Sequence, residues 1–153
     1  MLFILFHLGH DRYALEAAQI VEVLPLVDIR PIPRAPPGVA GVFNYHGAPV
    51  PAIDLNQLTL NKPARTSLGT RIIIVHYPNT TGAKRLLGLI AERATETMQR
   101  DPGEFSNTGL CNDNAPYLGP VVFDPRGLIQ RIDVHTLLPA SVRDALFRQA
   151  EEV

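Results

Sequence analysis

Short apolar runs separated by turn residues recur along the whole chain and predict β-strands. The first run covers residues 2–8, and another covers residues 71–77 around the uninterrupted Ile72-Ile73-Ile74-Val75. Further strands are predicted at residues 13–15, 20–24 and 86–91, and residues 95–98 are predicted to continue the last of these after a bend. Runs of this length, bounded by Gly, Pro, Asn and Asp, are typical of strands and far too short to span a membrane.

One segment of this pattern occurs twice, at residues 39–58 and 117–138. The first copy contains Gly41-Val42-Phe43-Asn44-Tyr45-His46-Gly47 and the second contains Gly119-Pro120-Val121-Val122-Phe123-Asp124-Pro125-Arg126-Gly127. In each copy a second apolar strand follows the turn and ends in Ile-Asp before Leu or Val. The Asp is well placed to cap a short helix, because its carboxylate accepts N–H groups of the first turn. The repeat predicts two similar β-rich modules.

The segments between the strands divide the chain. Residues 25–37 carry five prolines, which cannot sit inside a ladder because proline lacks the N–H donor. The polar residues 61–70 are the candidate boundary between the halves, and residues 139–153 have the apolar spacing of a helix. About ten strands are therefore predicted in two five-stranded, closed or partly closed sheets. Residues 1–38 and 39–66 are assigned mainly to the first sheet and residues 67–138 mainly to the second.

Composition narrows the class of protein. The 153 residues are 46% hydrophobic with a net charge of -1, which fits a packed domain and disfavours nucleic acid or an anionic membrane as a partner. The apolar start at residues 1–6 has no basic flank and is interpreted as a strand, not a signal peptide. The single cysteine, Cys111, excludes an internal disulfide and is compatible with the cytoplasm.

The sequence shows no convincing catalytic, metal or cofactor motif. The five histidines (His7, His10, His46, His76 and His135) have no partner at a recurring metal-ligand spacing, and nucleophile-elbow and phosphate-loop motifs are absent. Asp54 and Asp133 occupy equivalent places in the repeat, and we interpret them as helix caps in preference to paired catalytic carboxylates. No catalysis, metal or cofactor is predicted.

Tyr45 and His46 stand out at the predicted tip of the first hairpin. Asn44 and Gly47 satisfy the usual demands of a tight turn, so the aromatic ring and the imidazole are not required by the backbone. They form a contact for a partner in one interpretation. In the other, Tyr45 packs into the core and His46 is solvated.

The order of these motifs resembles the CheW-like adaptor domain of bacterial chemotaxis. The resemblance rests on Phe6-His7-Leu8-Gly9-His10-Asp11-Arg12-Tyr13-Ala14-Leu15, on the Val-Glu-Val-Leu of residues 21–24, on Pro36-Pro37 and on the first repeat copy through its Pro-Ala-Ile-Asp-Leu. Later segments at residues 71–75, 86–92 and 117–119 match its second half. The resemblance extends over residues 2–140.

That resemblance implies an all-β fold of two five-stranded SH3-like β-barrels packed together, with short helices and a C-terminal helix. It implies a non-enzymatic scaffold that couples methyl-accepting chemoreceptors to a CheA-type histidine kinase. The expected partners are the hairpin tip of the receptor, in a groove between the barrels, and the kinase regulatory domain, with possible self-association through barrel edges. The expected location is the cytoplasm, at membrane receptor arrays. The partner-binding positions carried over are Ile20, Glu22, Gly41, Asn44, Tyr45, His46, Gly47, Gly88 and Glu92.

Two departures identify the chain as a divergent member of the family. Asn44-Tyr45-His46-Gly47 replaces the usual Asn-Leu-Arg-Gly, exchanging a permanently charged arginine for a smaller imidazole. Residues 88–92 replace the usual Gly-Ile-Val-Asp. Three alternatives remain: a small-ligand-binding β-barrel protein with a polar pocket between the barrels, a kinase-binding regulator of a non-chemotaxis pathway, and an enzyme in which Asp54 orients His46 as general base.

Overall fold

The computed structural model of the 153-residue chain describes residues 1–78, 84–107 and 115–152. The sequence Pro-Asn-Thr-Thr-Gly of residues 78–82 predicts a turn, and residues 79–82 of it lie outside these ranges, as does Cys111. The strands are β1 (Leu2–Leu8), β2 (Asp11–Glu16), β3 (Ile20–Pro25), β4 (Val39–Tyr45), β5 (Ala48–Asp54), β6 (Arg71–Pro78), β7 (Lys84–Gln99), β8 (Leu118–Asp124) and β9 (Gly127–Ile132). The helices are α1 (Leu55–Leu60) and α2 (Ala140–Glu152), with 3-10 turns η1 (Ala17–Gln19), η2 (Pro102–Glu104) and η3 (Val134–Thr136).

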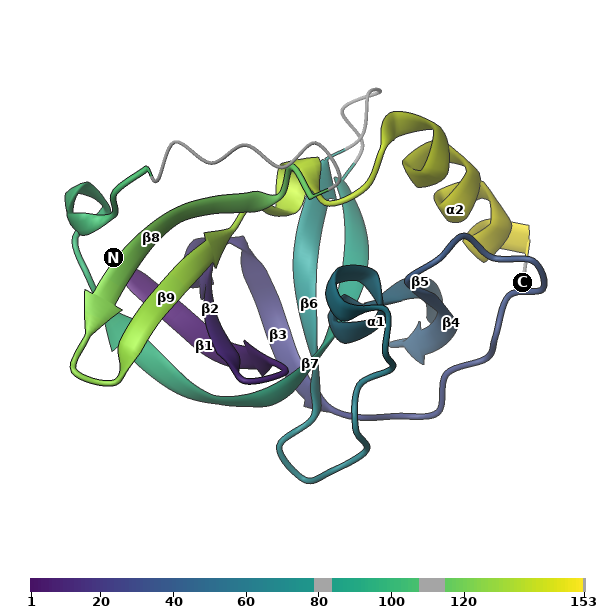
Figure 1. The fold of residues 1–153 in the computed structure, drawn as a ribbon. Helices are drawn as coiled ribbons and strands as arrows, with labels where there is room; N and C mark the ends of the chain where they lie inside the picture. Colours follow the sequence, from purple (N-terminus) through teal and green to yellow (C-terminus); the bar gives the residue numbers. More distant parts are fainter. Residues whose placement is uncertain (79–83, 108–114, 153) are drawn as a thin grey trace.

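The predicted all-β class and the C-terminal helix are confirmed (Figure 1). Residues 86–91 and 95–98 belong to one 16-residue strand, β7, as predicted. The described ranges contain nine strands, where about ten were predicted for the whole chain.

The strand pairs fall into two groups of five that share β7. Unit A consists of β1, β2, β8, β9 and the C-terminal part of β7, which pairs with β1 through residues 92–99. Unit B consists of β3, β4, β5, β6 and the N-terminal part of β7, which pairs with β5 and β6 through residues 84–91. This grouping is consistent with the predicted pair of small barrels.

The predicted assignment of consecutive stretches of chain to the two units is wrong. Strands β3, β4 and β5, from residues 20–54, pair with β6 and β7 in unit B, whereas β1 and β2 pair with β7 and β9 in unit A. The physical reason is that β7 is long enough to pair in both units and the chain crosses between them twice.

The sequence repeat corresponds to a structural repeat. Each copy is an antiparallel hairpin, β4–β5 or β8–β9, whose second strand also pairs in parallel with a distant strand. Strand β5 pairs with β7, and β9 pairs with β2. In both copies the Asp that ends the hairpin caps the following helical turn, as predicted. Asp54 accepts N–H bonds from Asn56 and Gln57, and Asp133 accepts one from His135.

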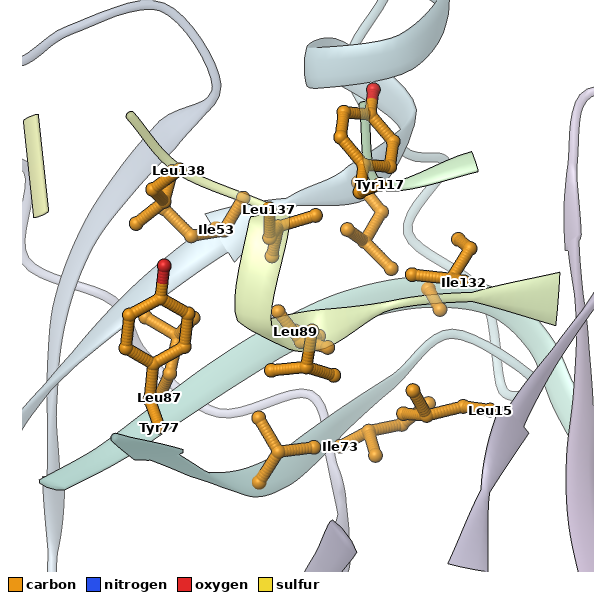
Figure 2. Packing of buried hydrophobic residues seen from close by; sticks show 14 of the residues in the cluster. Leu15, Ile53, Ile73, Tyr77, Leu87, Leu89, Tyr117, Ile132, Leu137 and Leu138 are labelled. Atoms are coloured by element: carbon orange, nitrogen blue, oxygen red, sulfur yellow. The ribbon is translucent and has the colours of Figure 1, made fainter. Parts of the chain in front are cut away.

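Apolar side chains form one core inside each unit and a third, larger core between them. Phe43, Ile72 and Ile74 belong to the interior of unit B, while Phe3 and Ile129 belong to that of unit A. Figure 2 shows the shared core, where side chains from both units meet: Leu15, Ile53, Ile73, Leu89, Ile132, Leu137 and Leu138. Alternate residues of β6 therefore face two different cores, which explains the unbroken apolar run at residues 72–75.

Helix α2 packs on unit B through its apolar face. Leu146 and Phe147 are buried, and the ring of Phe147 lies 5.8 Å from that of Tyr77, measured between centroids. The Arg85 guanidinium lies 5.1 Å from the Phe147 centroid, in cation–π contact. Burial of this face holds the helix against the sheet, since a 13-residue helix is marginal in isolation.

Candidate functional site

The tip of the β4–β5 hairpin is a two-residue turn formed by His46 and Gly47. Tyr45 pairs with Ala48, so the turn residues lie between them with φ values of 51° and 85°. Positive φ at both positions is the signature of a type I′ turn, which matches the twist of the flanking strands. The Asn44 side chain accepts the Gly47 N–H at 2.8 Å. His46 itself therefore adopts the left-handed conformation, at a position where type I′ turns favour Asn or Gly.

Tyr45 connects this tip to β3. Its hydroxyl donates to the Glu22 carboxylate at 3.4 Å, and its ring lies 4.4 Å from the His46 ring in an edge-to-face arrangement. Partial burial and the nearby Glu22 charge raise the pKa of Tyr45. Strands β3 and β4 lie at opposite ends of the pairing order of unit B, so this contact spans its two outer strands. At the tip, Tyr45 packs partly against the core of unit B, and His46 is exposed.

These residues form one exposed cluster, here called the hairpin face. It consists of Glu22 with Asn44, Tyr45, His46 and Gly47. Five of the nine predicted partner-binding residues thus lie together.

A groove of about 450 Å³ runs along the same hairpin. It lies between the hairpin and the proline-rich crossing segment, and it is lined by Asp28, Arg30, Phe43, Asn44 and Pro49 among others. The backbones of Arg30 and Val42 exchange two hydrogen bonds of 2.8 Å, which fixes the crossing segment against β4. Sequence reasoning missed this groove because nothing in the proline-rich segment shows which strand it follows.

The other four predicted positions lie elsewhere. Gly41 and Gly88 are buried, so neither presents a surface to a partner. A Cβ at Gly41 would overlap the Arg30 carbonyl, and one at Gly88 would meet the Phe43 ring. Ile20 is half-buried against the shared core. The Glu92 carboxylate accepts the backbone N–H of Arg65 at 3.1 Å, on a cleft between the units.

The catalytic alternative fails on geometry. Asp54 and His46 stand at opposite ends of β5, and seven residues of extended strand span roughly 20 Å. Both Asp54 carboxylate oxygens are already engaged, one by the cap of α1 and the other by the N–H of Ala64 at 2.9 Å. Asp54 therefore does not orient His46 as a general base.

Two further searches concern the residues that the structure describes. They contain no group of three or more His, Cys, Asp or Glu side chains arranged to hold a metal ion. Within the same ranges no helix has the length and apolar character needed to cross a membrane.

Comparison with known proteins identifies the family. Residues 2–142 match the sequence model of the CheW-like domain. The chain belongs to the CheW-like family. A chemotaxis protein CheW of Treponema pallidum is 27% identical over 143 residues, which cover 86% of this chain and 78% of that protein. A chemotaxis protein CheW of Helicobacter pylori is 28% identical over 118 residues, covering 75% of this chain and 68% of that protein.

Solved structures agree with this result. The crystal structure of the scaffolding protein TtCheW from Thermoanaerobacter tengcongensis superposes with a TM-score of 0.78 at 26% identity, covering 90% of this chain and 87% of that one. Proteins of the CheW-like family act as non-enzymatic scaffolds in chemotaxis signalling that couple receptors and a kinase. The predicted family, its all-β fold and its scaffold role are thus confirmed.

Proposed function

We propose that this protein couples a methyl-accepting receptor to a CheA-type histidine kinase, and that the hairpin face binds the receptor tip. The observation that supports the site is the Tyr45–Glu22 contact. It brings residues 23 positions apart in sequence into one exposed cluster with His46 at its edge. The cluster is centred on a tyrosine, a residue type that is enriched at protein interfaces and their hot spots.

The turn geometry supports this role for His46. Asn and Gly are the residues that type I′ turns favour, and an imidazole with φ of 51° offers no advantage to the backbone. The side chain is exposed, and its described ring contact is to the neighbouring Tyr45. A residue held in a costly conformation with its side chain in solvent is expected to contribute a contact to a partner.

The kinase regulatory domain is proposed to bind away from the hairpin face, at the outer strands of the sheets. Such outer strands retain unpaired N–H and C=O groups that favour pairing between chains. Self-association through the same strands belongs to this proposal. We also propose that the protein acts in the cytoplasm, recruited to receptor arrays.

The test of the hairpin face is binding of purified variants to a receptor hairpin-tip fragment and, separately, to the kinase regulatory domain. His46→Ala is expected to weaken receptor binding several-fold, and Tyr45→Phe to weaken it by loss of the hydroxyl that holds Glu22. Arg126→Ala is the matched control, because Arg126 occupies the turn of the equivalent β8–β9 hairpin. Equal receptor affinity of the His46→Ala and Arg126→Ala proteins would contradict the assignment. If the His46→Ala protein lost only kinase binding, the hairpin face would be assigned to the kinase and not to the receptor.

A further inference from the structure

A second concave region lies between the two units, apart from the hairpin face. This cleft of about 700 Å³ is bounded by the β1–β2 turn, by the end of α1 with the loop that follows, and by β7 where it passes from unit B to unit A. Its size is in the range of small-molecule sites in proteins. The residues that carry the argument are His7, His10, Asn56, Lys62, Arg65 and Arg93.

Asn56 contributes a buried acceptor without a partner. Its side-chain amide N–H₂ donates to the carbonyl of Lys62 at 2.8 Å and to that of Pro63 at 3.4 Å, which fixes the orientation of the amide. The residue is 5% exposed, and its Oδ1 has no hydrogen-bond partner among the described atoms. Buried polar atoms are nearly always satisfied. Asn56 lines the cleft but Oδ1 itself is covered, so an N–H donor of a ligand would satisfy it by displacing the atoms that cover it.

The cleft also collects cations. Among the described residues, neither Lys62, Arg65 nor Arg93 forms an ion pair with a carboxylate. The two acidic residues of the lining are Asp11 and Glu92, and Glu92 already accepts the backbone N–H of Arg65. With both histidines neutral the lining carries a net charge of +1, whereas the whole chain carries -1. Burial and the nearby Arg93 lower the pKa of His7, as expected in a positive field.

Arg93 is held at this place in a strained conformation. Its φ is 51° inside β7, close to the register shift in the β1–β7 pairing. Glycine adopts such a conformation without steric cost, whereas for arginine the Cβ atom makes it sterically costly. The side chain is exposed and lines the cleft. Strain of this kind is typical of residues whose side chains serve a site.

We propose that this cleft binds a phosphate-bearing small molecule with an N–H donor, of which a nucleoside phosphate is the simplest representative. The guanidinium and ammonium groups of Arg93, Arg65 and Lys62 match phosphate oxygens. Asn56 Oδ1 accepts an N–H of the base, and the exposed side chain of Leu60 with the imidazole of His10 offers surfaces to a planar ring. The cleft is lined by residues other than those of the hairpin face, and among the nine predicted partner-binding positions it includes Glu92.

The test is isothermal titration calorimetry of the full chain with guanosine 5′-monophosphate, adenosine 5′-monophosphate, pyrophosphate and adenosine. At least one nucleoside monophosphate should bind saturably at a stoichiometry near one, more tightly than pyrophosphate or adenosine, and more weakly as salt rises. Absence of saturable binding of both monophosphates at up to about 5 mM would overturn the proposal, since that limit lies at the weak end of specific affinity. Equal binding of pyrophosphate and the monophosphates would overturn the assignment of Asn56 as a reader of the base.

Two glycine variants separate a ligand contact from a general effect of charge or fold. Arg93→Gly removes the charge and relieves the strained φ, so the variant should unfold at the same or a higher urea concentration than the wild type. Arg34→Gly is the matched control, because Arg34 is also an exposed arginine with positive φ, of 57°, but lies outside the cleft. Arg93→Gly is expected to weaken nucleotide binding by roughly fivefold or more, and Arg34→Gly to leave it unchanged. Equal affinities of the two variants would contradict the role of Arg93.

Discussion

Replacing Gly88 by alanine tests how the interior of unit B is packed. Gly88 lies on β7 between β5 and β6, beneath the ring of Phe43 on β4. A Cβ built at this position would lie 2.6 Å from Phe43 Cε1 and 3.0 Å from both Phe43 Cζ and Ile72 Cγ2. Real Cβ atoms do not approach other carbons at 2.6 Å, so the Phe43 ring would have to move within a fully packed core.

Two opposing effects determine how much Gly88→Ala changes the free energy of unfolding. An extra methyl group in a well-packed core costs about 1–3 kcal/mol, because neighbouring side chains leave their preferred rotamers. Alanine in place of glycine in a strand gains about 0.5–1 kcal/mol, because the unfolded chain loses less freedom. Gly88→Ala is therefore expected to lower the free energy of unfolding by about 1–2 kcal/mol.

The effect of Gly88→Ala on stability should change sign when the Phe43 ring is removed. Leucine at position 43 lacks the Cε1 and Cζ atoms that a Cβ at Gly88 would meet, so in a Phe43→Leu protein the gain from alanine is opposed only by Ile72. Gly88→Ala is then expected to be neutral or stabilising by up to about 0.5 kcal/mol. The coupling between the two substitutions would be about 1–2 kcal/mol, typical of residues in direct contact.

Urea unfolding of the four proteins, followed by far-ultraviolet circular dichroism, measures these free energies. The four proteins are the wild type, the two single variants and the double variant, and equal slopes against urea show that the compactness of the unfolded state is unchanged. The same loss of stability from Gly88→Ala in both backgrounds would refute the packing argument.

Three further predictions concern the repeat and its turns. Asp54→Ala should cost about 2 kcal/mol and Asp133→Ala about 0.5–1 kcal/mol in urea unfolding, because Asp54 accepts three N–H groups and Asp133 accepts one; equal losses would contradict this. The Arg12 guanidinium holds the pKa of Asp124 well below its ordinary value of 3.8. The pair therefore stabilises the fold above about pH 4, and this contribution is lost as the pH falls toward the lowered pKa. Asp124→Asn should cost roughly 3 kcal/mol at pH 7 and much less at pH 2, and a loss independent of pH would exclude the ion pair as its source. Gly47→Val should lower the free energy of unfolding by about 1–2 kcal/mol because its φ is 85°, and an unchanged melting temperature would show that the turn adapts.

Local features of the fold were predictable because they depend on neighbours in sequence. The capping roles of Asp54 and Asp133 follow from an acidic residue at the end of a strand, and both were found. The buried strand at residues 71–77 follows from its unbroken apolar run. The two hairpins follow from the repeat, although their turns differ. Gly47 follows His46 in a type I′ turn, whereas the second hairpin turns through Pro125 and Arg126 before Gly127.

Features that depend on long-range pairing were not predictable in the same way. Nothing within residues 84–99 shows that one strand pairs with β5 and β6 at one end and with β1 at the other, so the division of the chain between the units was wrong. The burial of Gly41 and Gly88 depends on Arg30 and Phe43, which approach them from other segments.

The functional surfaces show the same limit. Glu22 and Tyr45 were predicted as separate positions, and their contact appears only when β3 and β4 are placed in space. The cleft collects residues from three distant segments, at 7–11, 56–65 and 92–93. None of these segments carries a recognisable ligand-binding motif, so its cations and the unpaired Asn56 oxygen could be found only from the structure.

The adaptor role is tested most directly by asking whether this chain joins its two proposed partners in one complex. The kinase regulatory domain and a receptor hairpin-tip fragment from the same genome would be mixed with and without the purified chain and examined by sedimentation velocity. We predict a complex of all three that forms only when the chain is present and is reduced by His46→Ala. Binding of neither partner by a correctly folded chain, or binding of one that displaces the other, would contradict the adaptor role.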